Sequence, residues 1–516
     1  MSIVGRPGPG KARDTLAPHN GRDRADLLVT GADAVVTMDH QRRVLTETAI
    51  AIHDGRIIDV GPNGQLRAAY PDAEELDARG GVITPGLINA HQHLTGDRLA
   101  RCTIPDRLHP EEAITQWAIP LHACQEPDDE ELAATLACLE AVRNGVTTII
   151  EAGTVATPDR VAAAVRAVGI RAGLGIWSWD PPQGLHAAPT QQVLERLADH
   201  LEQYPPGGQI EGWVTLIGHH QVSDALLQGA VNLARSHGAQ MTLHISSSDR
   251  DPAAYLERHG ARPIVHFSRL GILGPHLLLA HALHIDQRET DLLLDTHTAV
   301  SMSPWAYLRL GQDAVHLARH SQFVTHGGRA ALGCDSENAG DQVDILRTAA
   351  LFAAFLPTEN PACEDFPSRA RLAFELATIR GAQAIGREAD LGSLEPGKQA
   401  DLVIFDTRHP SWIPRGADPY LQLVWGTDGR SVRDVIVAGR PVVRIGRCTR
   451  IDEYALAVQA QHRAPALLHR TGVQALSQRH APSTLGTANH PNQVRQPDRL
   501  NPQQPPVADP VQGSSA

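Results

Sequence analysis

Residues 85–97 read PGLINAHQHLTGD, an apolar strand-like run that ends in two histidines one residue apart. Successive side chains of an extended strand point to opposite faces, so His91 and His93 share a face and can reach one metal ion. In a parallel α/β barrel, catalytic sites lie at the carboxyl ends of the strands, which is where this pair falls. The stretch predicts a buried barrel strand that carries part of a metal site, although an H-x-H pair alone is a weak signal.

Outward from this stretch, residues 85–385 alternate apolar β runs with amphipathic helical runs, the pattern of βα units around a parallel sheet. In one unit we expect Asp128 and Glu131 to form a capping box and Gly145 to end the helix before the strand VTTIIEAG. The sequence therefore predicts an α/β fold with a (β/α)8 TIM-type barrel. Its strands should begin near residues 86, 146, 171, 210, 240, 277, 299 and 329.

Two segments that flank the barrel, 26–84 and 386–450, carry short β runs of similar length and alternation. Examples are DLLVTGADAVVTM and TAIAIHDGRIIDVG in the first segment, and ADLVIFD and VRDVIVAGRPVV in the second. We expect the two segments to pair into one small β-sandwich domain. The ends, residues 1–25 and 465–516, have no apolar period and are predicted to be disordered.

The composition limits the classes of partner. Lys and Arg total 46 against 58 Asp and Glu, a net charge of −12, so nothing in the bulk charge attracts nucleic acid or an anionic membrane. A small-molecule substrate is expected instead. The six cysteines form no C-x-x-C pair, and neither a secretory signal nor an apolar run long enough for a bilayer occurs. These features predict a soluble cytoplasmic protein.

Two further candidate ligands end later strands. His244 lies in QMTLHISSS, the fifth expected strand, and Asp335 lies in RAALGCDSENAGD, the eighth. Three histidines and one carboxylate are a suitable donor set for a borderline-soft divalent ion. The alternatives are that Asp335 merely caps the following helix and that His244 is a hydrogen-bonded core histidine.

The runs PGLINAHQH, LLLAHALHID, GCDS and LGSLEPGKQADLVIFD together resemble the amidohydrolase superfamily, in the branch of cytosine, guanine and S-adenosylhomocysteine deaminases and triazine hydrolases. The resemblance extends over residues 28–445. It implies a homodimer. It also implies a mononuclear site, because binuclear members bridge two ions with a lysine on strand four and the run IEGWVTLIGHH has none. Zinc is expected, and iron or manganese would also suit the donors. The implied ligands are His91, His93, His244 and Asp335.

The resemblance also implies roles for other residues. Asp335 would take a proton from the metal-activated water, and His281 would polarise the reacting centre; the alternative for His281 is a buried histidine that orients a ligand. His284 matches a more peripheral histidine. His219 and His220 match a substrate-contacting position on strand four, where only one of two neighbouring residues can point inward.

One departure concerns strand five, where deaminase members read H-x-x-E and use the glutamate to shuttle protons. This chain has Ser247 at that position. Serine is no general acid near neutral pH, so either another carboxylate replaces the glutamate or the leaving group needs little protonation, as chloride would. Asp249, Glu151 and Glu337 are unranked candidates for the replacement.

Aromatic and acidic side chains give hints about the substrate. Trp117, Trp177, Trp179 and Trp305 fall near the expected active face, where they could stack on a planar ring, cover the core or line a dimer contact. Glu337 and Asp341 would favour a basic or amino-bearing substrate, unless they only begin the next helix.

These features predict a metal-dependent hydrolase that removes an amino group from a nitrogen heterocycle or an amidine by cleaving a C–N bond that is not a peptide bond. The first alternative is displacement of chloride or an alkylamine, or opening of an amide, at the same site. A second alternative is an inactive barrel that serves as a binding or assembly module. The intact ligand set favours the enzyme.

Overall fold

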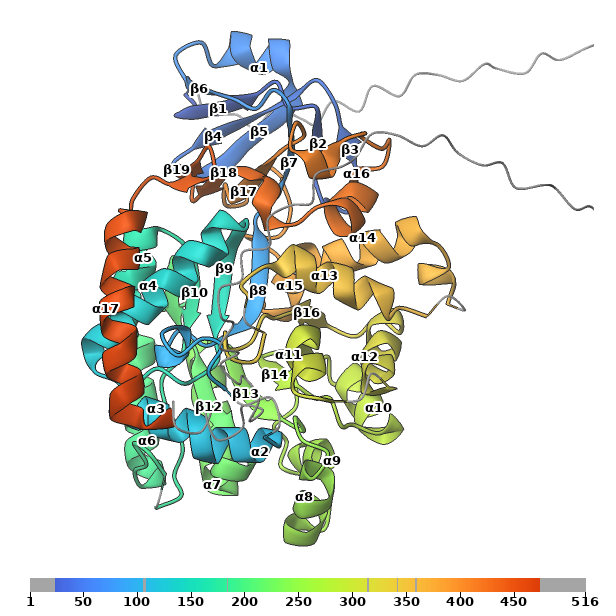
Figure 1. Cartoon of the computed structure of the whole chain (residues 1–516). Coiled ribbons are helices and arrows are strands. Elements are labelled where there is room, and N and C mark those ends of the chain that lie inside the picture. Colours follow the sequence, from blue (N-terminus) through green and yellow to red (C-terminus); the bar gives the residue numbers. More distant parts are fainter. Residues whose placement is uncertain are drawn as a thin grey trace, which may run out of the picture.

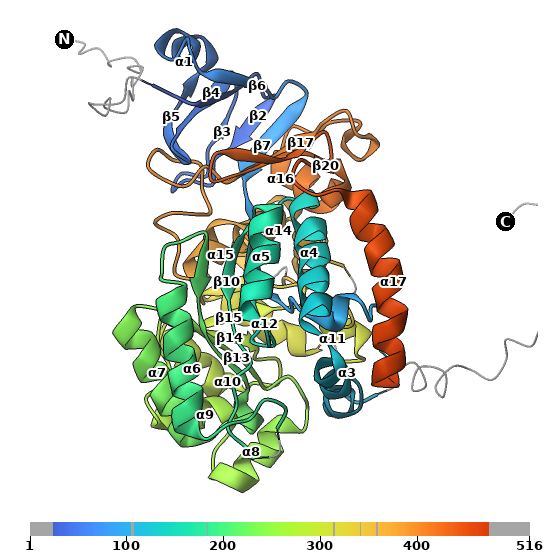
Figure 2. The ribbon, with the colours of Figure 1, turned by 90° about the vertical axis from the view of Figure 1, so that its left-hand side faces the viewer.

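The computed structural model describes residues 24–104, 108–182, 184–312, 315–340, 342–357 and 360–473. Most of the termini predicted to be disordered lie outside these ranges. Figures 1 and 2 show a β-rich part built from both ends of the described chain, above a larger α/β part that carries the middle of the chain.

The α/β part contains parallel strands in two hydrogen-bonded sheets, with orders β11-β10-β9-β8 and β12-β13-β14-β15-β16. The expected fourth strand is divided at Trp213, whose N–H donates to Leu174 O at 2.9 Å and so links the two sheets. At the other edge β16 packs beside β8. This arrangement fits the expected TIM-barrel fold. The bounds are β8 Leu87–Gln92, β9 Val146–Glu151, β10 Arg171–Leu174, β11 Ile210–Gly212, β12 Val214–Gly218, β13 Met241–Ile245, β14 Leu277–His281, β15 Ala299–Met302 and β16 Ala330–Leu332.

Helices follow the strands and cover the outside of the sheets (Figure 2). Glycines end several of them; Gly238, at φ 62°, closes α7 immediately before β13, as short α/β connections require. The helices after β9 are α5 Pro158–Val168, α6 Thr190–Gln203, α7 Asp224–His237, α8 Asp251–His259, α9 Pro263–Arg269, α10 Gln287–Asp295, α11 Pro304–Arg309, α12 Val315–Thr325, α13 Ile345–Ala354, α14 Phe366–Ala377 and α15 Ile379–Ala384. None of the described helices is both long and apolar enough to cross a bilayer.

Between β8 and β9 the chain forms a helical insertion and then the long helix α4 (Pro127–Arg143). The insertion consists of η1 Gly96–Arg98, α2 Pro110–Ala113, the π-helical turn η2 Ile114–Ala118 and α3 Ile119–Cys124. The expected capping box of Asp128 and Glu131 is wrong. The box is formed by Glu126 and Asp129, because Pro127 fixes the first helical φ and starts the helix earlier.

The two chain ends meet in one seven-stranded sheet, with order β20-β19-β18-β17-β7-β2-β3. C-terminal β17 pairs antiparallel with N-terminal β7, so the expected pairing of the two flanks is observed. A four-stranded sheet, β5-β4-β1-β6, shares a buried core with it. The bounds are β1 Leu27–Thr30, β2 Ala34–Val36, β3 Val44–Leu45, β4 Thr48–His53, β5 Arg56–Pro62, α1 Asn63–Ala69, β6 Glu74–Asp77, β7 Gly81–Pro85, β17 Leu402–Asp406, β18 Val432–Val437, β19 Arg440–Arg444 and β20 Arg447–Cys448.

A helix that the sequence reading missed, α17 (Glu453–Thr471), runs along α4 and α3 (Figures 1 and 2). Asp452 caps its N-terminus, and Arg463 and Arg470 bond to Asp129 of α4. The part of the predicted disordered tail from 465 to 471 is therefore helical, because these ion pairs and apolar contacts hold it against the barrel. Smaller elements are η3 His219–Gln221, η4 Pro361–Cys363, η5 Pro410–Trp412, α16 Pro419–Leu421, η6 Gln422–Gly426 and η7 Gly429–Ser431.

Candidate metal centre and cavity

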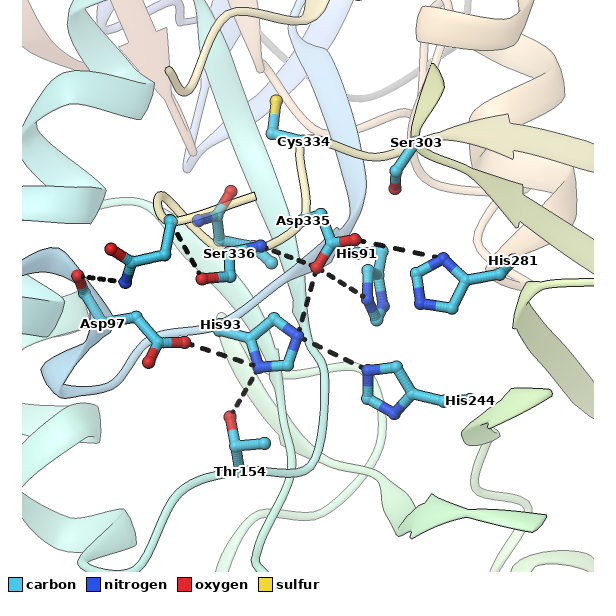
Figure 3. A network of polar contacts seen from close by, with 12 residues as sticks. His91, His93, Asp97, Thr154, His244, His281, Ser303, Cys334, Asp335 and Ser336 are labelled. Carbon is cyan, nitrogen blue, oxygen red and sulfur yellow. Dashed lines mark hydrogen bonds and ion pairs between the residues drawn. The ribbon is translucent and has the colours of Figure 1, made fainter. Parts of the chain in front are cut away.

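The expected metal-binding side chains meet at the carboxyl ends of separate strands (Figure 3). His91 lies in β8 and His93 directly after it, while His244 lies in β13. Asp335 follows β16, and its backbone N–H donates to His91 O at 2.9 Å, which brings the last strand against the first. His281 ends β14, whose register with β13 is fixed by parallel pairing.

The distances within this cluster are short. His93 Nε2 lies 3.4 Å from Asp335 Oδ1, and His91 Nε2 lies 3.6 Å from the same oxygen. His244 Nε2 faces His93 Nε2 at 3.4 Å. Ligand atoms of His281 also lie within 4.8 Å of those of His91 and His244. The structure thus brings the four expected ligands together and adds His281 at their edge.

The orientation of the rings fits a cation. His93 Nδ1 bonds to Thr154 Oγ1 at 2.9 Å, and this hydroxyl in turn donates to Glu151 Oε1 at 3.1 Å. His244 Nδ1 donates to the carbonyl oxygen of Ile217. With protons on both Nδ1 atoms, the Nε2 lone pairs face each other inside the cluster. His91 Nε2 is buried without a hydrogen-bond partner among the described residues. Lone pairs that converge without donors are what a divalent ion satisfies.

Burial also sets the protonation of the cluster. It lowers the pKa of His91 and His244, and it lowers that of His281 to about 3, so these rings are neutral ligands or donors. Burial would raise the pKa of Asp335, but the adjacent rings of His91 and His93 hold it well below its usual range. For His93 the bond to Asp335 outweighs burial and raises the pKa to about 9. A proton and a metal ion would therefore compete for this nitrogen.

His281 has a partner that the sequence reading missed. The Tyr307 hydroxyl accepts from the Ser303 N–H at 2.9 Å and lies 3.3 Å from His281 Nδ1. If the hydroxyl donates to Nδ1, the neutral ring carries its proton on Nε2. The backbone is strained here: His281 and Asp335 have φ values of 72° and 67°, in the left-handed region that side chains avoid. Strain at this edge accords with a functional cluster.

A cavity of about 220 Å³ opens in front of the cluster. The predicted substrate contacts Trp117, Trp179, His219 and His220 line it, as do Trp177, Ser247 and the candidate ligands His93, His244 and Asp335. Trp177 and Trp179 contact edge to face, at 5.4 Å between ring centroids. The tryptophans offer flat faces that suit a planar ring.

Three predicted substrate contacts lie elsewhere. Trp305 is 36% exposed and lies under the guanidinium of Arg347, away from the lining. His284 lies behind the residues that line the cavity, and its Nε2 bonds at 2.6 Å to Gln312, which is one of them. Glu337 is buried beside Arg98, at 3.6 Å, and burial raises its pKa to about 7. Trp305 lies in α11, whereas His284 and Glu337 lie in the loops that follow β14 and β16.

The expectation that only one of His219 and His220 faces inward is wrong. Strand β12 ends at Gly218, and both histidines form the one-turn helix η3, in which neighbouring side chains need not alternate. Both border the cavity and approach Asp251: His220 Nε2 lies 2.9 Å from Oδ1, and His219 Nε2 lies 3.6 Å from Oδ2.

None of the three candidate replacements for the strand-five glutamate borders the cavity in the described part of the chain. Asp249 is exposed and pairs with His109 at 3.1 Å. Glu151 is buried and accepts from the N–H groups of Gly153 and Thr154. Asp341, the further acidic residue suggested above, lies outside the described residues. Among those described, the lining carboxylates are Asp97, Glu111, Asp251 and Asp335.

The chain is similar to known proteins over most of its length. A family model described as "Amidohydrolase family" matches residues 82–442, and a model described as "Imidazolonepropionase-like composite domain, bacteria" matches residues 49–73. A 5-methylthioadenosine/S-adenosylhomocysteine deaminase of Syntrophobacter fumaroxidans is 30% identical over 429 residues, which cover 82% of this chain and 94% of the relative. A 5'-deoxyadenosine deaminase of Methanosarcina mazei is 29% identical, over 86% of this chain and 99% of its own length.

Solved structures share the fold. An adenosine deaminase from Xanthomonas campestris with bound zinc aligns with a TM-score of 0.79 and 24% identity, over 87% of this chain and 100% of its own. The zinc complex of an atrazine chlorohydrolase from Arthrobacter aurescens aligns with a TM-score of 0.74 and 23% identity, over 85% and 100%. At these identities the likeness is one of fold.

Proposed function

The chain belongs to the amidohydrolase family, and from that premise we propose that it deaminates an amino-substituted nitrogen heterocycle at a single divalent metal site. It is a metal-dependent hydrolase of C–N bonds other than peptide bonds. The observation that carries the proposal is the convergence of His91, His93, His244 and Asp335 beside an aromatic cavity. These four would hold the ion, which we propose to be zinc.

A bound divalent metal supplies Lewis acidity and activates a water molecule for attack near neutral pH. Asp335 would accept the proton from the attacking water. With the Tyr307 hydroxyl donating to Nδ1, His281 would carry its proton on Nε2 and would stabilise the negative charge that develops on oxygen. The roles of Asp335 and His281 are those expected from the sequence.

The proposed substrate is a one- or two-ring amino heterocycle of the aminopurine type. The relatives are named as deaminases of adenosine derivatives. The cavity of about 220 Å³ is smaller than sites for drug-sized ligands, and Trp117 and Trp179 offer flat apolar surfaces to a ring. Buried Asp97, whose Oδ1 has no hydrogen-bond partner among the described residues, would accept from an amino group of the substrate.

Ammonia release tests the proposal. Zinc-loaded protein would be offered amino-substituted purines, pyrimidines, pterins and triazines, with His91→Ala as the metal-free control. Release that vanishes in His91→Ala supports deamination. Silence across the panel from metal-loaded protein contradicts it.

Ser247 favours a second candidate, displacement of chloride or an alkylamine or opening of an amide at the same site. Ser247 borders the cavity without an acidic function, and of these leaving groups chloride fits it best, because chloride departs as a stable anion without a proton donor whereas an amine must be protonated. Chloride release without ammonia release would select this reaction. An inactive binding module would instead hold no ion in a metal assay of purified protein.

We further propose that the parallel strands close into one (β/α)8 barrel over 85–385, and that 26–84 and 386–450 form one β-sandwich domain. The shared core of the two flanking sheets supports the second point. A homodimer follows from the family resemblance, and the exposed Phe366 and Trp425, in edge-to-face contact, offer it an apolar surface. Sedimentation velocity tests the dimer. Free thiols at Cys102 and Cys448 accord with a reducing cytoplasm.

A further inference from the structure

Asp251 joins two histidines on the wall of the cavity. It is the first residue of α8, four positions beyond Ser247, and it is 3% exposed. Its Oδ1 lies 2.9 Å from His220 Nε2, and its Oδ2 accepts from the Ser248 N–H at 3.0 Å. These donors hold the carboxylate in one orientation toward His220.

The tautomer of His219 places a lone pair next to the Asp251 carboxylate. His219 Nδ1 lies 3.3 Å from His244 O and donates to it, which leaves a lone pair on Nε2. That Nε2 is buried without a hydrogen-bond partner in the described chain and faces Asp251 Oδ2 at 3.6 Å. A lone pair and a carboxylate side by side favour a positive charge next to them.

His220 is the more accessible histidine of the two. Its side chain is 27% exposed, whereas that of His219 is 4% exposed. With Nε2–H bonded to Asp251, Nδ1 is the ring atom left to pass a proton to a bound molecule, and the ring borders the cavity.

The other lining carboxylates are less suited to deliver a proton. Glu111 lies 3.4 Å from the Arg250 guanidinium and also accepts from Ser248 Oγ at 3.2 Å, so its oxygens already have partners. Asp97 faces His122 Nε2 at 3.5 Å and His93 Nδ1 at 4.0 Å, on the side of the metal ligands.

We propose that His220, held by Asp251, is the acid that protonates the leaving nitrogen, in place of the glutamate that Ser247 replaces. This rests on the proposed deamination. The proton moves from His220 Nδ1 to the amino group of the tetrahedral species, the C–N bond breaks with its electron pair on nitrogen, and ammonia leaves as the carbonyl forms. Of the two protons of the water, one ends on the ring nitrogen and the other restores His220. Asp251 stays ionised throughout.

A pair of substrates with the same ring but different leaving groups tests the assignment, because chloride needs no proton to depart. In Asp251→Asn and in His220→Gln, kcat/KM for the amine should fall about 10²- to 10⁴-fold, the usual contribution of a general acid. For the chloride it should fall less than about tenfold. Asp249→Asn, an exposed carboxylate on the same loop, is the matched control and should leave both reactions unchanged.

Equal losses for both leaving groups, or no loss for the amine, would overturn the proposal. Metal content is measured in parallel: one ion per chain is expected in the wild type and in both variants. Two ions in the wild type and one in Asp251→Asn would show that His219, His220 and Asp251 bind a cation instead. A metal-loaded wild type that releases chloride but no ammonia would refute the deamination itself, and the donor role with it.

Discussion

The two walls of the cavity are built differently. The inner wall carries His93, His244 and Asp335, with His91 next to them, on buried parallel strands or in the loops that follow them, and hydrogen bonds orient the rings of His93 and His244. The outer wall comes from the helical insertion 108–124, the loop that bears Trp177 and Trp179, and the one-turn helix η3. The inner wall is thus a polar cluster fixed by the sheet, and the outer wall is a largely aromatic surface on appended segments. The contrast indicates that the reaction depends on the sheet and the choice of substrate on the segments around it.

The largest effect should follow from deleting an inner-wall ligand. His91→Ala removes one of the converging nitrogens, so bound metal and ammonia release should both be lost, with kcat/KM lower by at least about 10³-fold. Metal analysis and turnover measure this, with the exposed His237→Ala as control. Full activity of a metal-free His91→Ala protein would contradict the assignment of the reaction to the inner wall.

A second large effect concerns stability alone. Arg171 at the start of β10 forms a buried double hydrogen bond with Asp401, with Nε–Oδ2 at 2.6 Å, and thereby ties the barrel strands to the flanking sheet. Arg171→Met leaves the buried Asp401 carboxylate without its cationic partner, so the free energy of unfolding should fall by about 3–5 kcal/mol. Denaturant unfolding measures the loss. The kcat of the folded fraction should not change, since neither residue borders the cavity; a lower kcat would show that the flanking sheet shapes the inner wall.

The inner wall was also the part that the sequence could predict. Side chains alternate along a strand, and barrel sites lie at the carboxyl ends of the strands, so His91, His93, His244 and Asp335 could be placed together from three short motifs. The starts of the barrel strands were predicted for the same reason. The outer wall has no such period: His219 and His220 lie in a one-turn helix, and Asp251 and Tyr307 reach the site through loop and helix geometry that no motif encodes. Helix α17 was not predicted, because its interior Pro465 and its polar sequence give no sign of its contacts with α4.

A smaller effect is expected from Thr154, which contacts a metal ligand and is not itself a ligand. Thr154 accepts from His93 Nδ1 and thereby holds the ring with Nε2 facing inward. Thr154→Val keeps the volume but removes the acceptor, so metal affinity should fall about 10- to 100-fold, as for other partners of ligand histidines. Competition with a chelator measures the affinity, and Thr154→Ser, which retains the hydroxyl, is the control. Unchanged affinity in Thr154→Val would mean that packing alone orients His93.

The smallest effect concerns two tryptophans that were both predicted from the sequence to contact the substrate. Trp117 is 2% exposed and lines the cavity, whereas Trp305 lies outside it under Arg347. Trp117→Leu keeps an apolar side chain but removes a stacking surface worth about 0.5–1.5 kcal/mol, so KM should rise about 2- to 12-fold with little change in kcat. Trp305→Ala should leave both constants unchanged. If Trp305→Ala raised KM and Trp117→Leu did not, the substrate would enter from the side of α11, and the outer wall would have to be reassigned to the helices that follow β15.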